Sequence, residues 1–181
     1  MMDRVILAGF GGQGVMFIGR VLAYAGMVSD LNLCWIPSYG PEMRGGTANC
    51  SVILSDEEIH SPVIDFADGA IVLNKPAYDK FAPRIKPGGV LIVNSSLAKL
   101  DEKRKDIKII EIPATDMASE MGNVGITNMV CLGALLPSLQ LIDLDKVKKA
   151  MKELTEKRPE LFELNLTAIN KGIDFIKNST K

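Results

Sequence analysis

The chain has 181 residues, of which 47% are hydrophobic and 24% are charged. A chain of this length and composition can bury one sizeable core, so we expect a single domain over residues 1–181 and exclude a disordered chain. Its 21 basic and 22 acidic residues give a net charge of -1. No global positive field is available to hold a phosphate backbone, so nucleic acid is not an expected partner.

Six short apolar runs predict β-strands at residues 5–8, 31–36, 48–54, 69–74, 90–94 and 107–112. Most are continuously apolar, as strands covered on both faces are. The run at 48–54 instead partly alternates, because Asn49 and Ser51 interrupt its apolar positions. This pattern predicts an antiparallel strand or one near an edge. If its polar side meets solvent, the isolated chain has a surface through which a homodimer could form.

Helical periodicity lies between these runs and dominates the last third of the chain. It predicts helices at residues 14–29, 76–84, 127–139, 143–156 and 159–178. Lys86, Pro87, Gly88 and Gly89 predict a turn, and the charged run 101–106 predicts a solvated loop. The alternation indicates an α/β fold, with a mostly parallel sheet of about six strands flanked by helices and a helical C-terminus.

The cysteines and the single histidine do not form a metal-binding pattern. Cys34, Cys50 and Cys131 are far apart, without a CxxC spacing, and His60 stands in a polar turn. We therefore expect no zinc or iron–sulfur site carried by this chain alone, and we expect Cys34 and Cys131 in the core. The odd cysteine count, a first strand without a preceding signal peptide, and the lack of an apolar run of about 20 residues favour a cytoplasmic protein without a membrane span.

The most informative short motif is GFGGQG at residues 9–14, which matches GxGxxG. It follows the first strand directly and precedes the first helix, as in a Rossmann-like βα unit. Glycines allow a phosphate to approach the backbone, and the N–H groups of a helix start favour an anion. The candidate binding residues are Gly9, Gly11, Gly12, Gln13 and Gly14. The simpler alternative is that the glycines only make a tight turn.

The motif for a dinucleotide site is incomplete. Such a site also needs an acidic residue at the end of the second strand, roughly 20 residues further on. Here that strand leads into Pro37, Ser38 and Tyr39, whereas Asp30 precedes it. A free-standing NAD- or FAD-binding protein therefore remains an alternative with only part of its sequence signature.

The loop after the second strand, PSYGPEMRGGT at residues 37–47, is unusual in composition. Arg44 is suited to bidentate binding of a phosphate or carboxylate, and Gly45 and Gly46 leave room for a ligand or another chain. Tyr39 adds an aromatic ring and completes the candidates in this loop. An ordinary turn with a surface ion pair between Glu42 and Arg44 is the alternative.

Polar residues also follow two later strands. Asn74 and Asn94 stand at strand ends and could face the same crevice, but asparagine is also a standard capping and turn residue. Helix capping and turn formation are therefore the preferred interpretation for both side chains.

Together, GFGGQG, YGPEMRGG at residues 39–46 and the following Asn-Cys-Ser strand resemble the gamma subunit of 2-oxoacid:ferredoxin oxidoreductases. GNVGITNM at residues 122–129 resembles a later segment of that family, so the similarity covers the whole chain. The resemblance implies one subunit of an enzyme that oxidatively decarboxylates a 2-oxoacid to an acyl-CoA and reduces ferredoxin. It implies that the glycine-rich motif and Asn128 lie near coenzyme A, and that this chain supplies no catalytic residue.

In this family, thiamine diphosphate, Mg²⁺ and iron–sulfur clusters are held by sister subunits, so the resemblance implies alpha, beta and delta partners. It leaves pyruvate, 2-oxoglutarate and branched-chain 2-oxoacids open as substrates, and a related family acting on indolepyruvate has a similar domain. A purely structural subunit, with nothing bound at the glycine motif, is a further alternative.

Overall fold

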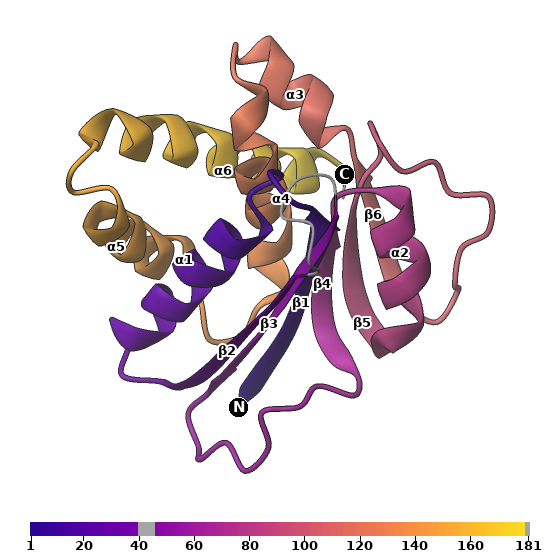
Figure 1. Ribbon diagram of the computed structural model, residues 1–181, viewed down its shortest axis with the longest axis horizontal. Coiled ribbons are helices and arrows are strands. Elements are labelled where there is room, and N and C mark those ends of the chain that lie inside the picture. Colours follow the sequence, from indigo (N-terminus) through magenta and orange to yellow (C-terminus); the bar gives the residue numbers. More distant parts are fainter. Residues whose placement is uncertain (40–45, 180–181) are drawn as a thin grey trace.

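The computed structural model describes residues 1–39 and 46–179 (Figure 1). Its strands are β1 (Met2–Phe10), β2 (Asn32–Tyr39), β3 (Thr47–Ser55), β4 (Ala67–Val72), β5 (Ile85–Asn94) and β6 (Lys108–Ile112). Its α-helices are α1 (Val15–Met27), α2 (Lys75–Phe81), α3 (Ala114–Glu120), α4 (Thr127–Leu135), α5 (Leu144–Leu154) and α6 (Pro159–Ser179). Short 3-10 turns occur at Ala82–Arg84, Val124–Ile126 and Leu136–Ser138. The predicted α/β class and the helical C-terminus are confirmed.

The six strands form one sheet in the order β2-β3-β1-β4-β5-β6. β1, β4, β5 and β6 pair in parallel, whereas β3 runs antiparallel to both β1 and β2. The mostly parallel sheet is therefore confirmed, as is the antiparallel strand next to an edge. In β3, Asn49 and Ser51 are half-buried between the buried Ala48, Cys50 and Val52, which follows the partial alternation of the sequence.

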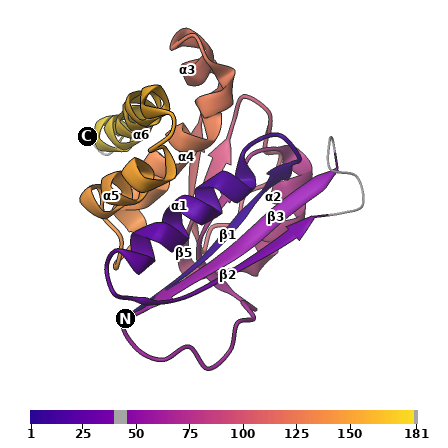
Figure 2. The same cartoon turned by 60° about the vertical axis from the view of Figure 1, so that its left-hand side comes forward.

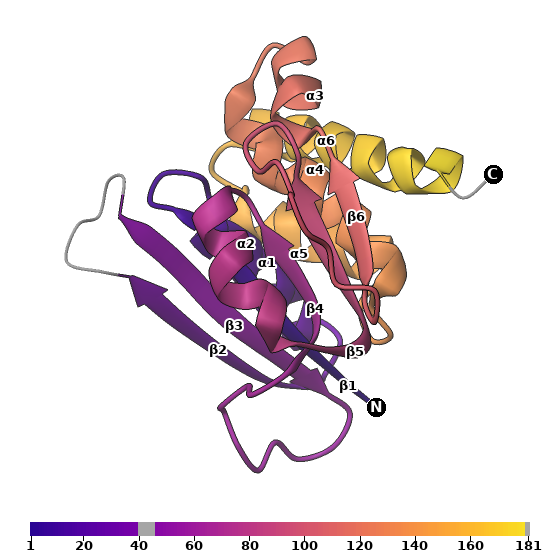
Figure 3. The same cartoon turned by 90° about the vertical axis from the view of Figure 1, so that its right-hand side faces the viewer.

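Helices cover both faces of the sheet, but unequally. Figure 2 shows α1, α4, α5 and α6 stacked on one face, and Figure 3 shows α2 on the other. The larger core includes Leu7, Leu22, Ile71 and Met129, all of which are inaccessible to solvent. The smaller core, under α2, includes Ile6, Val72, Phe81 and Val93. Strands buried on both sides explain the continuous apolar runs in the sequence.

Side-chain caps set the start of two helices. The Asn74 side chain accepts a hydrogen bond from the Ala77 N–H at 2.9 Å and so begins α2. Asp143 accepts one from the Lys146 N–H at 2.9 Å and begins α5. Such caps satisfy N–H groups that have no partner inside the helix. The capping role predicted for Asn74 is confirmed.

Helices α4 and α6 approach each other through a pair of glycines. A Cβ atom on Gly133 would lie 2.0 Å from the Ile169 carbonyl oxygen, and one on Gly172 would lie 2.0 Å from the Val130 carbonyl oxygen. Any side chain at either position would therefore force the two backbones apart. This contact fixes the position of α4, whose first turn supports the candidate site.

Two local expectations were wrong. Residues 86–89 lie within β5 instead of forming a separate turn, although Gly88 has a positive φ of 79°. The irregularity is absorbed as a register shift against β4 between Ala67 and Gly69, and the Gly88 N–H donates to the Asp106 carbonyl at 2.7 Å. The sequence reasoning also missed α3, a helix of 7 residues whose buried positions are only Ala114 and Ala118.

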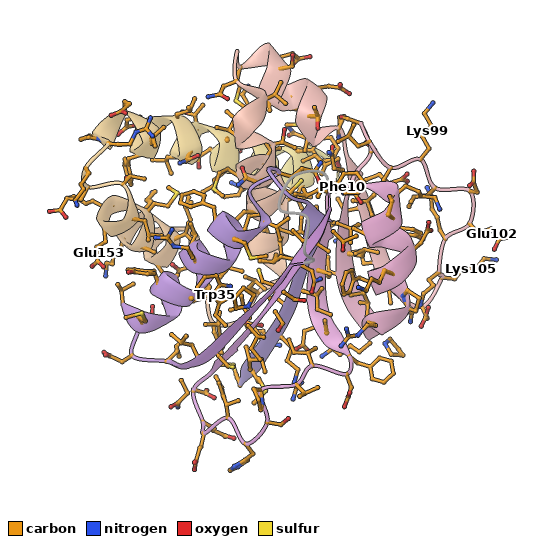
Figure 4. The ribbon with its side chains drawn as sticks, viewed as in Figure 1. Phe10, Trp35, Lys99, Glu102, Lys105 and Glu153 are labelled. Carbon is orange, nitrogen blue, oxygen red and sulfur yellow. The ribbon has the colours of Figure 1, made fainter. Side chains whose placement is uncertain are left out.

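The charged run at 101–106 forms a mostly exposed loop, as predicted. Figure 4 shows Lys99, Glu102 and Lys105 pointing away from the body of the molecule. Arg104 holds this loop to the protein by donating to the carbonyl oxygens of Ala82 and Ile85, at 2.8 Å each. The run is therefore a solvated surface loop that Arg104 attaches to the rest of the protein.

Candidate functional site

The glycine loop, residues 9–14, turns the chain from the end of β1 into α1, and Figure 4 shows Phe10 at this end of the sheet. Gly12 and Gly14 have φ angles of 94° and 76°, a region that residues with a side chain rarely adopt. A Cβ on Gly14 would also lie 2.3 Å from the Asn128 amide nitrogen, whereas a Cβ on Gly12 would meet open space. Glycine at position 14 is thus required by backbone angle and packing together.

Gln13 holds the shape of the loop from inside. Its Oε1 accepts the Phe10 N–H at 2.6 Å and the Asn74 Nδ2 at 3.0 Å. Because Asn74 follows β4, this side chain joins the ends of the two parallel strands β1 and β4. The structure therefore gives Gln13 a supporting role in the loop, and its predicted role in ligand binding stays a prediction.

The loop presents backbone donors without acceptors. The Gln13 N–H donates to the Phe10 carbonyl at 3.1 Å and the Gly11 N–H to the Gly46 carbonyl at 2.9 Å. Within the described part of the chain, four other N–H groups at the loop and the start of α1 have no acceptor: Gly12, Gly14, Val15 and Met16. α1 also has no side-chain cap and no acidic residue in its first turn. These groups and the helix dipole favour an anion.

These donors face a pocket of about 400 Å³, which we call the loop pocket. Its described lining consists of Phe10, Gly11, Gly12, Gly14, Val15, Met16 and Ala48. The side chains in this set are apolar, so its polar character comes from the backbone. A ligand with an anionic group and an uncharged remainder would match both parts of this lining.

The second candidate loop meets the glycine loop at its end. Gly46 accepts the bond from Gly11, and the next residue, Thr47, pairs with Phe10 in the sheet. Tyr39 is the last residue of β2, where its backbone pairs with Ala48. Its side chain lies outside the described structure, as do Arg44 and Gly45. The binding roles predicted for these residues therefore stay predictions.

Asn128 reaches the glycine loop from the far end of the sequence. It lies in the first turn of α4, is 4% exposed, and donates from Nδ2 to the Gly14 carbonyl at 3.1 Å. Its Oδ1 accepts the Met129 N–H at 3.0 Å. The structure thus brings Asn128 to the predicted site and gives it a supporting contact with the loop backbone.

A smaller pocket of about 180 Å³, which we call the crevice pocket, lies on the other side of the glycine loop. Its lining consists of Gly12, Gln13, Leu73, Leu97, Thr115, Val124, Gly125 and Thr127. Sequence reasoning did not single out Leu97, Thr115 or Val124. Since Leu97 and Thr115 follow β5 and β6, the rule that ligands bind beyond the carboxyl ends of strands was the signal that could have found them.

Two of the three cysteines, Cys50 and Cys131, lie in the core. Cys50 and Cys131 are buried, and burial raises the pKa of the Cys50 thiol to about 11 and that of Cys131 to about 12. Cys34 is half-buried in β2. The described residues contain no group of three or more His, Cys, Asp or Glu side chains that could hold a metal ion. These residues do not fit an iron–sulfur cluster or a Mg²⁺ site.

No helix in residues 1–39 or 46–179 is long and apolar enough to cross a membrane.

Comparison with known proteins identifies the family. A model described as "Pyruvate ferredoxin/flavodoxin oxidoreductase" matches residues 4–175. The chain belongs to this family. It is 36% identical over 180 residues to the 2-oxoglutarate synthase subunit KorC of Methanocaldococcus jannaschii. This match covers 98% of the chain and 95% of KorC.

Other relatives in the family are longer. The chain is 32% identical over 177 residues to the ketoisovalerate oxidoreductase subunit VorA of Methanothermobacter marburgensis, which covers 97% of the chain but 37% of VorA. A solved 2-oxoglutarate:ferredoxin oxidoreductase from Magnetococcus marinus, with 2-oxoglutarate, coenzyme A and succinyl-CoA bound, is also much longer than this chain. Its TM-score to this oxidoreductase-family chain is 0.87 at 26% identity, with 98% of this chain and 31% of that chain covered.

A solved structure of similar length also matches. The gamma subunit of a keto/oxoacid ferredoxin oxidoreductase from Geobacter sulfurreducens superposes with a TM-score of 0.80 at 29% identity, over 97% of this chain and 99% of that one. The fold of the family chain is thus found both as a separate subunit and as part of a longer polypeptide.

Proposed function

We propose that this chain is the gamma subunit of a 2-oxoacid:ferredoxin oxidoreductase, which converts a 2-oxoacid to an acyl-CoA while reducing ferredoxin. Family membership supports this, as does the match over nearly full length to KorC and to a solved gamma subunit. Its contribution is assembly of the complex and binding of the phosphates of coenzyme A. The proton transfers and electron transfers belong to other subunits.

The observation that carries the coenzyme A role is the set of free backbone donors on the loop pocket. Coenzyme A has a pyrophosphate and a 3′-phosphate, and the N–H groups of Gly12, Gly14, Val15 and Met16 form a surface suited to such anions. The uncharged remainder of the ligand matches the apolar side chains of the pocket. Arg44 is expected to add a positive charge from the neighbouring loop.

The remaining cofactors are proposed for partner subunits. The family resemblance assigns thiamine diphosphate, Mg²⁺ and the iron–sulfur clusters to the alpha, beta and delta subunits, and the absence of a cysteine cluster among the described residues agrees with this for the iron–sulfur clusters. Purification of this chain from its native cells without oxygen, with the bound proteins identified by mass spectrometry, tests this assignment. We expect a thiamine-containing subunit and a cysteine-rich subunit to accompany it, and recovery of the chain alone would contradict the proposal.

A free-standing dinucleotide-binding protein is not supported. β2 ends at Tyr39 without an acidic residue to hold ribose hydroxyls, and Asp30 lies in the turn before this strand. Binding of NADH by the isolated chain at micromolar concentration, measured by fluorescence titration, would favour that alternative.

The loop itself is tested by Gly12→Leu, with Gly88→Leu as the matched control. Both glycines have a positive φ and open space at the Cβ position, so the backbone strain is similar, but only Gly12 lines the pocket. In the assembled complex we expect Gly12→Leu to raise the KM for coenzyme A about tenfold or more, because the side chain blocks the anion. The KM for the 2-oxoacid should not change. Equal KM values for coenzyme A in the two variants would contradict the proposal and favour a purely structural subunit.

A further inference from the structure

Part of the sheet has no helix over it on the α2 side. Figure 3 shows α2 in front of the sheet, while β2 and β3 lie beside it with no helix of the described chain in front of them. A hollow of about 220 Å³, which we call the sheet hollow, lies on this side, and its lining includes Ile36, Ser51 and Val63. Ile36 is 40% exposed. This side of the two strands is therefore open to contact by another protein.

The connection between β3 and β4, residues 56–66, continues this open surface. It lines a second hollow of about 460 Å³, which we call the lower hollow, and Val63 is common to both hollows. Val63 and Phe66 are 65% and 60% exposed, which is high for large apolar side chains. Apolar side chains exposed within a polar rim are typical of surfaces that bind another protein. The two hollows therefore form one continuous candidate surface.

The lower hollow is remote from the glycine loop. Met2 and Arg4, at the start of β1, line the lower hollow, whereas the glycine loop follows the other end of this strand at Phe10. Figure 1 likewise shows the connection between β3 and β4 beside the N-terminus. A strand of nine residues separates the two places by about 25 Å. A protein that occupies the lower hollow therefore leaves the loop pocket accessible to a ligand.

The acidic side chains of this surface are available to a partner. Residues 56–66 contain four acidic residues and no Lys or Arg. Glu58 and Asp65 line the lower hollow, and neither forms an ion pair within residues 1–39 and 46–179. Free carboxylates at the rim of an apolar hollow favour a partner that carries positive charge there.

The basic side chains of the same surface already have partners. Arg4 pairs with Asp68 at 3.7 Å, and Lys86 pairs with the same carboxylate. Arg84 donates to the Ile64 carbonyl oxygen. These contacts hold the positive groups against the protein, so the charges left free around the lower hollow are negative.

A second copy of this chain matches the surface poorly. In a two-fold symmetric contact the same patch lies on both sides, so one acidic segment would face another, and like charges oppose association. Extension of the sheet through β2, its edge strand, is also disfavoured, because Pro37 has no N–H with which to pair to a strand of another chain. The occupant that the charges favour is a different protein.

We propose that the two hollows dock a partner subunit of the same oxidoreductase, which places an apolar side chain against Val63 and Phe66 and surrounds it with Lys or Arg side chains. This proposal rests on the proposed function, because it takes the chain as one subunit of a complex. Docking would remove the two exposed apolar side chains from water and give Glu58 and Asp65 ion-pair partners at the rim.

The test uses Val63→Lys and the double variant Glu58→Lys with Asp65→Lys. Each replaces the wild-type chain in its native cells, carries an affinity tag and is purified without oxygen. Met27→Lys is the control for the first, because Met27 is 57% exposed and ends α1 on the other side of the sheet. Glu153→Lys is the control for the second, because Glu153 is exposed on α5, where Figure 4 shows it pointing away from the molecule. The readout is the amount of the thiamine-containing and cysteine-rich subunits recovered per tagged chain.

We expect both surface variants to lower this recovery about tenfold or more, and both controls to leave it unchanged. The loss in the double variant should shrink at high salt, since screening weakens repulsion between like charges. In the complex that still forms, the KM for coenzyme A should be unchanged, because the surface lies away from the glycine loop. Thermal unfolding of each isolated variant, matched to the wild-type chain, shows that the losses do not come from misfolding.

Several results would overturn the docking proposal. Wild-type recovery in both surface variants is one, and an equal loss in Met27→Lys is another. Self-association of the isolated wild-type chain in analytical ultracentrifugation, abolished by Val63→Lys, would place a second copy on the surface instead. If the wild-type chain recovers its partner subunits and the surface variants recover as much, only the docking proposal fails. If the wild-type chain is recovered alone, the proposed function fails as well.

Discussion

Replacing Asn128 by alanine tests how the far end of the chain supports the glycine loop. The side chain is 4% exposed and makes two hydrogen bonds, one to the Gly14 carbonyl at 3.1 Å and one from the Met129 N–H at 3.0 Å. The Gly14 carbonyl also accepts from the N–H groups of Phe17 and Ile18, so it keeps partners in the variant. The buried Met129 N–H lies in the first turn of α4 and loses its acceptor.

The free energy of unfolding should therefore fall by about 2–3 kcal/mol. About 1 kcal/mol comes from the lost bond to Gly14, and about 1–2 kcal/mol from the buried N–H of Met129 left without a partner. Denaturation of the chain in urea, followed by circular dichroism, measures this change. A loss below about 0.5 kcal/mol would refute the claim that Asn128 stabilises the loop.

Asn128→Asp gives a sharper version of the same test. The carboxyl group can still accept from Met129, but when ionised it places a second negative oxygen against the Gly14 carbonyl. Burial and this repulsion raise the pKa of the introduced carboxyl above its usual value of about 3.9. The folded state then binds a proton more tightly than the unfolded state, so stability is lost as the pH rises through the raised pKa. We expect the variant to be less stable than Asn128→Ala at pH 7 and to recover at acidic pH, and equal stability of the two at pH 7 would contradict the geometry.

Two further predictions concern the core. Gly133→Ala should destabilise the chain by about 2–3 kcal/mol, because its Cβ would lie 2.0 Å from the Ile169 carbonyl oxygen, and this outweighs the helix-propensity gain of about 1 kcal/mol. Thermal unfolding measures the effect, with no loss contradicting the close contact. Cys50 and Cys131, with pKa values of about 11 and 12, should resist iodoacetamide at pH 8 until the chain unfolds, whereas the half-buried Cys34 should react earlier. Both values exceed the roughly 8.5 of unfolded cysteine, so the stability contributed by these thiols should fall as the pH rises above that value.

The Gly133→Ala prediction and the cysteine-labelling prediction each have a control. Lys171→Ala, an exposed change beside Gly172 on α6, should alter stability by less than about 0.5 kcal/mol. Mass spectrometry of peptides from the native and unfolded chain assigns the labelled cysteine. Labelling of Cys131 at the same rate in both states would show that its environment is not closed to solvent.

Much of the architecture could be predicted because its causes are local. Strands covered on both faces leave continuous apolar runs, and β3 shows its different exposure through Asn49 and Ser51. The glycine loop was recognisable because the angles at Gly12 and Gly14 exclude most other residues. These features can be predicted from the neighbouring sequence alone.

The rest of the site depends on contacts between distant residues. The bond from Asn128 to Gly14 spans 114 positions, and the one from Asn74 to Gln13 spans 61. A family resemblance pointed to Asn128, but no local pattern shows that it supports the loop backbone. Likewise, the turn expected at residues 86–89 lies within β5, between the pairs Ile85–Ala67 and Val90–Gly69, so the local Pro-Gly-Gly sequence forms an irregularity inside a strand whose two ends pair with β4.

The glycine contact between α4 and α6 has a consequence for the order in which the protein is made. α6 follows every other described element in the chain, yet it packs against the helix whose first turn holds the Gly14 carbonyl. Because synthesis proceeds from the N-terminus, residues 9–14 emerge from the ribosome long before the segment that completes their support. A nascent chain that still lacks α6 exposes the Gly133 face of α4. The support of the first loop to be synthesised is therefore complete only after the last helix has been made.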